Sequence, residues 1–511
     1  MSKLENSEVF VEYSQEQKEN GGDPGAGNST ADPHDPLTWS STRKLAILTS
    51  VSVYMFVGTF SMIVIGPALQ IVPREFHSAF SASTYLIGGP LLAYGVASFL
   101  WVPLANRYGA RLIFTTTSIV GACLSIWGAR ATSFGSLVAA RTLATGLFAS
   151  PETLAPQMIG DVFAPKDRAK AMTVIAIMQA VGFSVGPLAG SFIVQNSSLG
   201  WRWTEWIIVI LAFSSAAMIL LLMPETQYTN NPDRRPRRRI DDFRFWPVSG
   251  GGKRKVHRYR QARRSRRQEL IICPSLRAAF AVIFPYFFHP IVITSMVFFS
   301  ICLMVANYTM TTQSLSYQIE YGFSLGDSGL TFFAPMVGSL LAIILCGVLA
   351  DHYFQRLARK SQGKPPKPER RLPLFALTGP VGVAGTILFG VCTQNQCHWF
   401  APLFGTFLLL FSFTSAASIL FAYLLDVYEA RMDTVMVVFN GVKNIATFAI
   451  SYAIIPWNTS AGYSIPFIVL GLLLLAGHLL VGLIYWKGEA MRHWTATKFE
   501  SGKETHHGDA F

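Results

Sequence analysis

Charged residues are scarce in this chain. Only 14% of its 511 residues are Asp, Glu, Lys or Arg, whereas 51% are hydrophobic and the mean hydropathy is +0.37. A soluble chain of this length normally carries about 25% charged residues, spread over the surfaces of several domains. The scarcity of charge argues against a soluble multidomain protein and favours a membrane protein.

Several familiar chemical signals are also missing. The six cysteines are scattered, so no disulfide framework is expected. Cys392 and Cys397 flank a short outer turn and could form a bridge, but two separate thiols are the simpler interpretation. The polar residues 1–44 contain no apolar core and no cleavage pattern, so no signal peptide is expected. The absence of paired metal ligands, a Gly-x-Ser-x-Gly elbow and a phosphate-binding loop predicts neither an enzyme nor a metal site.

Apolar runs of about 20 residues, the length that a helix needs to cross a bilayer, recur along the chain. The expected architecture is an all-α membrane protein with twelve transmembrane helices in two six-helix pseudo-repeats. The expected parts are a disordered cytoplasmic N-tail (1–44), a six-helix bundle (45–223), a basic cytoplasmic central loop (224–290), a second bundle (291–486) and a cytoplasmic C-tail (487–511). The expected spans are 45–68, 84–105, 112–129, 134–158, 171–194, 204–223, 291–314, 328–350, 373–393, 399–425, 434–457 and 463–486.

The positive charge of the chain is distributed unevenly. Of the 42 Lys and Arg residues, only Arg74, Arg130 and Arg202 fall in expected outer loops, and Arg141 and Lys443 fall within spans. The rest occupy the tails and inner loops, as the positive-inside rule requires if both termini are cytoplasmic.

The central loop carries arginine clusters at 234–239 and 263–267. Such clusters can bind nucleic acid, but between two halves of a membrane protein they favour contact with anionic cytoplasmic lipid. We therefore expect membrane lipid, and no nucleic acid, as the partner of this loop.

The sequence contains an internal repeat and one helix face lined with glycine. The sequence LANRY at 104–108 follows the second span and LADHY at 349–353 follows the eighth, which indicates a duplication of the six-span unit. In the fifth span Gly182, Gly186 and Gly190 share one face and Pro187 interrupts the backbone bonding. These glycines predict a close packing interface, and Pro187 could in addition allow the helix to bend.

At this point the sequence resembles the major facilitator superfamily, in the twelve-span drug:proton antiporter branch common in fungi. The sequence PLANRYGAR at 103–111 resembles the loop motif between the second and third spans. Arg141 resembles the buried arginine of the fourth span, and GFSVGPLAG at 182–190 resembles the fifth-span signature of antiporters. Similarity extends over roughly 35–486, with supporting matches at 35–39, 201–203 and 224–226.

The chain departs from the loop motif at two positions. Asn106 stands where the family has an aspartate, and Ala110 stands where a basic residue is usual. The resemblance assigns this loop to locking one conformation, so the lock is expected to lack a charge-assisted hydrogen bond here. Asp351 keeps the acid in the second copy.

The resemblance implies alternating access to a central site near the midplane. Arg141 and Glu152 are eleven residues apart, which places them on one helix face at two levels of an expected cavity, with Thr145 and Phe148 between them. Arg141 could instead tie its helix to a neighbour, and Glu152 could be an ordinary solvated acid.

Lys443 lies in the middle of the eleventh span, where a charge is costly unless it faces a protein interior or water. Asn440 and Asn444 flank it, and Asn307 and Thr311 follow one face of the seventh span. Lys443 could alternatively be held by helix carbonyls. Two cations against Glu152 alone would favour a neutral or weakly acidic substrate over a polyvalent cation.

These observations predict a secondary active transporter, a proton-coupled exporter of small hydrophobic or amphipathic compounds such as drugs, toxins or secondary metabolites. The alternatives are an uptake transporter, working by symport or facilitated diffusion, and a transporter-like membrane sensor. We expect a monomer in the plasma membrane that uses no cofactor other than the proton gradient. The expected substrate and proton pathway comprises Arg141, Thr145, Phe148, Glu152, Asn307, Thr311, Asn440, Lys443 and Asn444, and the expected conformational residues are Asn106, Arg107, Gly109, Arg111, Gly182, Gly186, Pro187, Gly190 and Asp351.

Overall fold

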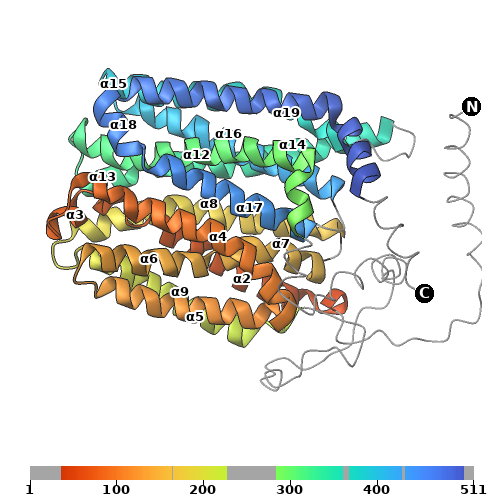
Figure 1. Ribbon diagram of the computed structural model, residues 1–511, viewed down its shortest axis with the longest axis horizontal. Helices are drawn as coiled ribbons and strands as arrows, with labels where there is room; N and C mark the ends of the chain where they lie inside the picture. Colours follow the sequence, from red (N-terminus) through yellow and green to blue (C-terminus); the bar gives the residue numbers. More distant parts are fainter. Residues whose placement is uncertain (1–35, 164, 227–282, 361–367, 429–431, 500–511) are drawn as a thin grey trace, which may run out of the picture.

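The computed structural model describes residues 36–163, 165–226, 283–360, 368–428 and 432–499, and this part of the chain is helical throughout. The long helices run side by side, and α3, α13 and α18 gather at one end of the molecule, here the distal end (Figure 1). The helices α2–α9 are called the N-terminal bundle and α12–α19 the C-terminal bundle.

The bounds of the long helices follow the expected spans closely. In the N-terminal bundle they are α2 Ser41–Ile63, α4 Tyr85–Tyr108, α5 Ala110–Ala129, α6 Phe134–Phe148, α7 Ser150–Val162, α8 Pro165–Gln195 and α9 Arg202–Leu222. In the C-terminal bundle they are α12 Pro290–Ile319, α14 Phe333–Lys360, α15 Phe375–Gln394, α16 Phe400–Val427, α17 Met432–Ser451 and α19 Ser464–Phe499. The short elements are η1 Pro36–Thr38, η2 Gly66–Ala68, α3 Ile71–Glu75, η3 Phe80–Thr84, η5 Phe284–Phe288, α13 Leu325–Leu330, η6 Pro368–Leu374 and α18 Ile454–Ala461.

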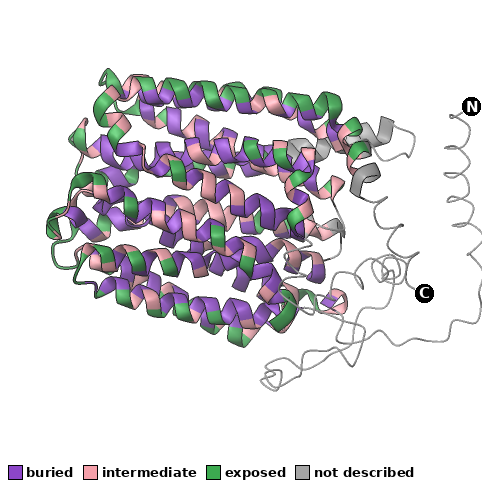
Figure 2. Ribbon diagram, viewed as in Figure 1, coloured by how far each residue is buried: buried purple, intermediate pink, exposed green. Residues whose placement is uncertain are grey.

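The exposed surface identifies the surroundings of the bundles. Large apolar side chains such as Ile344, Leu221 and Leu479 are 61%, 56% and 68% exposed. Exposed residues recur along the outer helices, whereas buried residues concentrate between them (Figure 2). Eleven helices in the described part of the chain are long and apolar enough to cross a membrane. The structure is therefore an all-helical membrane protein whose outer faces suit lipid.

The fourth expected span, 134–158, is two helices rather than one. Pro151 has no N–H group to donate to the carbonyl of Leu147, and that carbonyl instead accepts from the N–H of Ala149, where α6 ends. Each of the two helices is shorter than a full span, which is why eleven continuous spans are found where twelve were expected. The break places Glu152 in the first turn of α7.

Two expected boundaries also differ from the structure. The eleventh window, 434–457, ends earlier as a helix, because α17 stops at Ser451 and the chain turns into α18. The helix α19 continues past position 486 to Phe499, where an ion pair between Arg492 and Glu369 of η6 fastens its extension. The arginine clusters of the central loop and the side chain of Asp351 lie outside the described residues.

The glycine face of the fifth span packs α8 directly on α2. A methyl group on Gly182 would lie 2.8 Å from the carbonyl oxygen of Phe56, and one on Gly186 would lie 3.2 Å from that of Phe60. A methyl group on Gly190 would overlap the carbonyl oxygen of Val64. The expected packing interface is present, and α8 continues unbroken through Pro187.

We predict that Gly190→Ala lowers the thermal stability of the protein, because overpacking against a backbone atom costs about 1–3 kcal/mol. Gly160→Ala in α7 is the matched control, since nothing lies within 4 Å of the added methyl group. Melting of the purified protein in detergent, followed by intrinsic fluorescence, compares the two. Equal melting temperatures would show that the close approach of α2 and α8 is not needed for stability.

Candidate functional site

An ion pair joins the two bundles in their interior. Lys443 of α17 binds the carboxylate of Glu152 of α7, and the two residues are only 4% and 8% exposed. The Nε2 of Gln179 donates to the same carboxylate at 3.2 Å, and the Nδ2 of Asn440 donates to the backbone carbonyl of Glu152 at 3.3 Å. Lys443 is therefore held by a carboxylate of the opposite bundle, not by helix carbonyls.

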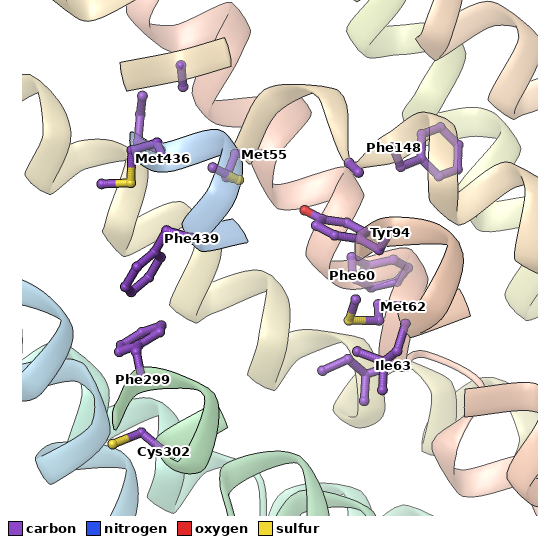
Figure 3. Close-up of a cluster of buried hydrophobic side chains, with 14 of the residues drawn as sticks. Met55, Phe60, Met62, Ile63, Tyr94, Phe148, Phe299, Cys302, Met436 and Phe439 are labelled. Atoms are coloured by element: carbon purple, nitrogen blue, oxygen red, sulfur yellow. The ribbon is translucent and has the colours of Figure 1, made fainter. Parts of the chain in front are cut away.

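Aromatic side chains surround this ion pair. The Nζ of Lys443 lies 5.4 Å from the ring centre of Phe299 and 6.0 Å from that of Phe439. The hydroxyl of Tyr94 lies beside Glu152. Figure 3 shows the rings of Phe299 and Phe439 facing each other, with Tyr94 beside Phe60 in the other bundle. Two opposite charges are thus enclosed by apolar rings, where their attraction is far stronger than in water.

A second buried ion pair lies within the N-terminal bundle. Arg141 of α6 binds Glu205 of α9, and both side chains are 2% exposed. The Nη2 of Arg141 also donates to the carbonyl of Ser61 in α2 at 2.9 Å. Ser61 is near the C-terminal end of its helix and Glu205 near the N-terminal end, which places this pair toward the distal end. Arg141 ties three helices of one bundle together.

The Arg141–Glu205 pair changes the count of buried charges that the sequence suggested. Arg141 was expected to be uncompensated, but Glu205 neutralises it, so two buried cations face two buried carboxylates. The expectation of a cationic interior is wrong, and with it the reason for disfavouring a polycation. Glu205 was overlooked because it follows the Trp–Arg–Trp sequence at 201–203, which resembles a membrane boundary.

The remaining residues of the expected pathway divide into two groups. Asn307 of α12 donates from Nδ2 to the hydroxyl of Ser451 of α17 at 3.4 Å. Thr311, also in α12, is buried. Asn444 donates to the carbonyl of Asn440 at 2.8 Å within α17. Both of these hydrogen bonds are made within the C-terminal bundle.

Thr145 and Phe148 behave differently. Both are buried in the N-terminal bundle, and the ring of Phe148 packs edge-on against Tyr54, 6.4 Å between centres, and beneath Gly121 of α5. Phe148 is a packing residue of its own bundle. Glu152 is turned toward α17 and Arg141 toward α2 and α9, so these two do not form one stripe of side chains.

The loop motif at 103–111 is fastened by the end of α9. Gly109 has φ +99°, a conformation that favours glycine, and the carboxylate of Glu225 accepts from the backbone N–H groups of Ala110 and Arg111 at 3.2 and 3.3 Å. Glu225 thereby caps the N-terminus of α5. Arg111 donates from Nη2 to the carbonyl of Leu220 at 2.7 Å.

Asn106 stands where the loop motif of the family has an aspartate, and it makes a hydrogen bond between two uncharged side chains. Its Oδ1 accepts from the Nε2 of Gln157 in α7 at 2.8 Å. Arg107 is exposed and lies over the ring of Tyr108, 5.4 Å from its centre. The motif is thus joined to α7, the helix that carries Glu152.

The bundles also meet at the distal end. The rings of Tyr85 and Tyr452 are in edge contact with centres 5.3 Å apart, and a methyl group on Gly88 would lie 3.2 Å from Tyr452. A methyl group on Gly329 would lie 2.5 Å from Ser191 of α8. The two halves are in close contact at this end.

Three contributors to the site were not recognised in the sequence: Tyr94, Gln179 and Glu205. Tyr94 and Gln179 are single polar residues in apolar runs, which is the signal that identified Lys443, whereas Glu205 follows Arg202 and Thr204 at the start of its span. In the described part of the chain, no group of three or more His, Cys, Asp or Glu side chains is arranged to hold a metal ion.

A model of the Major Facilitator Superfamily matches residues 51–451. This chain belongs to the major facilitator superfamily. It is a transporter of that family and not an enzyme. The MFS-type transporter hepF of Aspergillus oryzae is 26% identical over 402 residues, covering 73% of this chain and 74% of the relative. The efflux pump radE of Floropilus chiversii is 26% identical over 378 residues, covering 74% and 68%.

Solved structures show the same fold at low sequence identity. A D-xylose–proton symporter superposes with a TM-score of 0.63 at 13% identity, covering 87% of this chain and 97% of that protein. The human organic anion transporter MFSD10 gives a TM-score of 0.56 at 17% identity, covering 86% and 99%. At these identities the likeness concerns the fold alone.

We predict that Lys443→Met lowers stability strongly, because it leaves the Glu152 carboxylate buried without a counter-charge at a cost of about 3–5 kcal/mol. The double variant Glu152→Gln/Lys443→Met should recover most of this loss. A double-mutant cycle of melting temperatures in detergent measures the coupling.

The control cycle uses Arg371 and Asp426, whose more exposed side chains are 2.8 Å apart. That pair should show a coupling of about 1 kcal/mol or less. If the Glu152 and Lys443 effects were simply additive, the ion pair would not link the bundles.

Proposed function

We propose that this transporter exports small hydrophobic or amphipathic organic compounds in exchange for protons. The ion pair of Glu152 and Lys443 carries the proposal, because it places a titratable group between the two bundles that alternating access must separate. The resemblance of the sequence at 182–190 to the antiporter signature supports exchange rather than symport.

Glu152 is the proposed proton carrier. While Glu152 is ionised, it neutralises Lys443 and the region between the bundles has no net charge. Transfer of a proton to Glu152 removes the ion pair and leaves Lys443 as an unpaired cation among Phe299 and Phe439. A buried unpaired charge is costly, so it draws in water and disfavours an apolar ligand. Proton and substrate then compete for the site, as antiport requires.

The surroundings of the pair support an apolar or amphipathic substrate. Phe299, Phe439 and Tyr94 offer aromatic surface, which is typical of sites for such ligands. Asn307 and Ser314 add polar groups further along α12 from Phe299, and the hydroxyl of Ser314 has no hydrogen-bond partner in the described structure. One relative is named an efflux pump, which supports export rather than uptake.

The other parts of the proposal concern control and placement. The residues Asn106, Arg107, Gly109 and Arg111, fastened by Glu225, are proposed to hold α4, α5 and α7 together in one conformation. Asp351 is proposed to serve the second copy, and Pro187 and the glycine face of α8 to permit bending. We further propose a monomer in the plasma membrane, with both termini cytoplasmic and the central loop against anionic lipid.

Reconstituted liposomes with an imposed proton gradient test the function. The wild-type protein should move Nile red, a neutral hydrophobic dye, against the direction of proton flow. The double variant Glu152→Gln/Lys443→Met should abolish the effect of the gradient while substrate exchange at equal pH continues, because the site then has no net charge and cannot change it. Glu75→Gln, at a half-exposed carboxylate of the distal end, is the control that should keep the effect.

Two outcomes would contradict the proposal. Dye movement in the same direction as protons would indicate symport. Gradient-driven transport that persists in Glu152→Gln/Lys443→Met would exclude Glu152 as the proton carrier. Spermidine serves as the comparison substrate, since a polyvalent cation lacks the apolar surface that the aromatic rings would bind.

A further inference from the structure

The turn between α15 and α16 brings two cysteines together. The N–H of Cys397 donates to the carbonyl of Cys392 at 3.0 Å, and the N–H of Gln396 donates to that of Thr393 at 3.3 Å. These two bonds define a Schellman motif at the end of α15. In this motif the side chains at the positions of Cys392 and Cys397 regularly touch.

We propose that Cys392 and Cys397 form an intrachain disulfide. The hydrogen bonds of the turn hold the two residues close together, and both side chains are only partly buried, so an oxidant can reach them. The contact is not accidental, because the hydrogen bonds of the helix end fix both backbone positions. Among the other described cysteines, Cys302 and Cys346 are buried in α12 and α14 and Cys123 lies on α5, far from this turn in the chain.

The backbone of the turn supports the proposal. Gln396 has φ +47°, a left-handed conformation that usually requires glycine in this motif. A residue with a side chain keeps such a conformation when its surroundings hold it there. A covalent bond between the residues on either side of Thr393–Gln396 would hold it directly.

Neighbouring aromatic residues fasten the same turn. The hydroxyl of Tyr321 donates to the carbonyl of Cys392 at 3.2 Å, and that of Tyr317 donates to the carbonyl of Trp399 at 2.8 Å. The rings of Tyr317 and Tyr321 stack with centres 5.2 Å apart. The cysteines are therefore presented on a turn that is fixed from both sides, which favours bond formation.

The chemistry is thiol–disulfide exchange with an oxidised dithiol oxidoreductase. Cys392 and Cys397 lose two protons and two electrons to form the S–S bond, and the disulfide of the oxidoreductase takes them up to become a dithiol. Such oxidants act in the secretory pathway and outside the cell, not in the cytosol. The bond would thus place the distal end of the molecule on the non-cytosolic side, and both termini on the cytosolic side.

Mass spectrometry of the full-length protein in its own membranes tests whether Cys392 and Cys397 form the disulfide. Membranes are dissolved in denaturant with N-ethylmaleimide to block free thiols, and chymotrypsin releases the peptide 390–399, which contains both cysteines. Without reduction the peptide should carry no maleimide and weigh two hydrogens less than the dithiol form. After reduction it should accept two maleimides.

The Cys392→Ser variant completes the test. Its Cys397 should accept one maleimide without reduction, as Cys123 should in both proteins. Two maleimides on the unreduced wild-type peptide would overturn the proposal. If Cys397 of the variant accepts no maleimide without reduction, its thiol is bonded to a different partner. That result would also overturn the proposal. Neither result bears on proton coupling, which the liposome assay measures separately.

Discussion

A lysine and a glutamate from opposite bundles, enclosed by aromatic rings, are the interaction on which the rest of this transporter depends. Glu152 and Lys443 are nearly inaccessible to solvent, so neither charge is stable without the other. The proposed alternating access requires the two bundles to move apart, and they are joined by an ion pair that protonation of Glu152 would remove. The aromatic groups around the pair provide the apolar surface that an organic substrate would contact.

Local features of the sequence put these groups in place. Pro151 ends α6, and the break lets α7 direct Glu152 toward α17. The glycines of α8 allow it to approach α2 closely, and Arg141 ties α6 to α2 and α9 through Glu205 and Ser61. The N-terminal bundle is thereby made rigid around the residue that is proposed to change its charge.

Much of the fold followed from the sequence because the bilayer imposes a simple rule of length and hydropathy. The spans, the two-bundle organisation and the burial of Lys443 were all predictable in this way. The partners of the charges were not, since hydropathy gives no information on which helix faces which. Glu205 was therefore missed, Phe148 was assigned to the pathway although it packs within its bundle, and the break at Ala149 appeared as one continuous span.

The central claim is that substrate and proton exchange at Glu152, and proton release on substrate binding measures it most directly. A hydrophobic substrate is added to the purified transporter in weakly buffered detergent, and a pH indicator follows the solution. The account predicts proton release from the wild-type protein, and none from Glu152→Gln at equal substrate occupancy. Equal release from both proteins would contradict it.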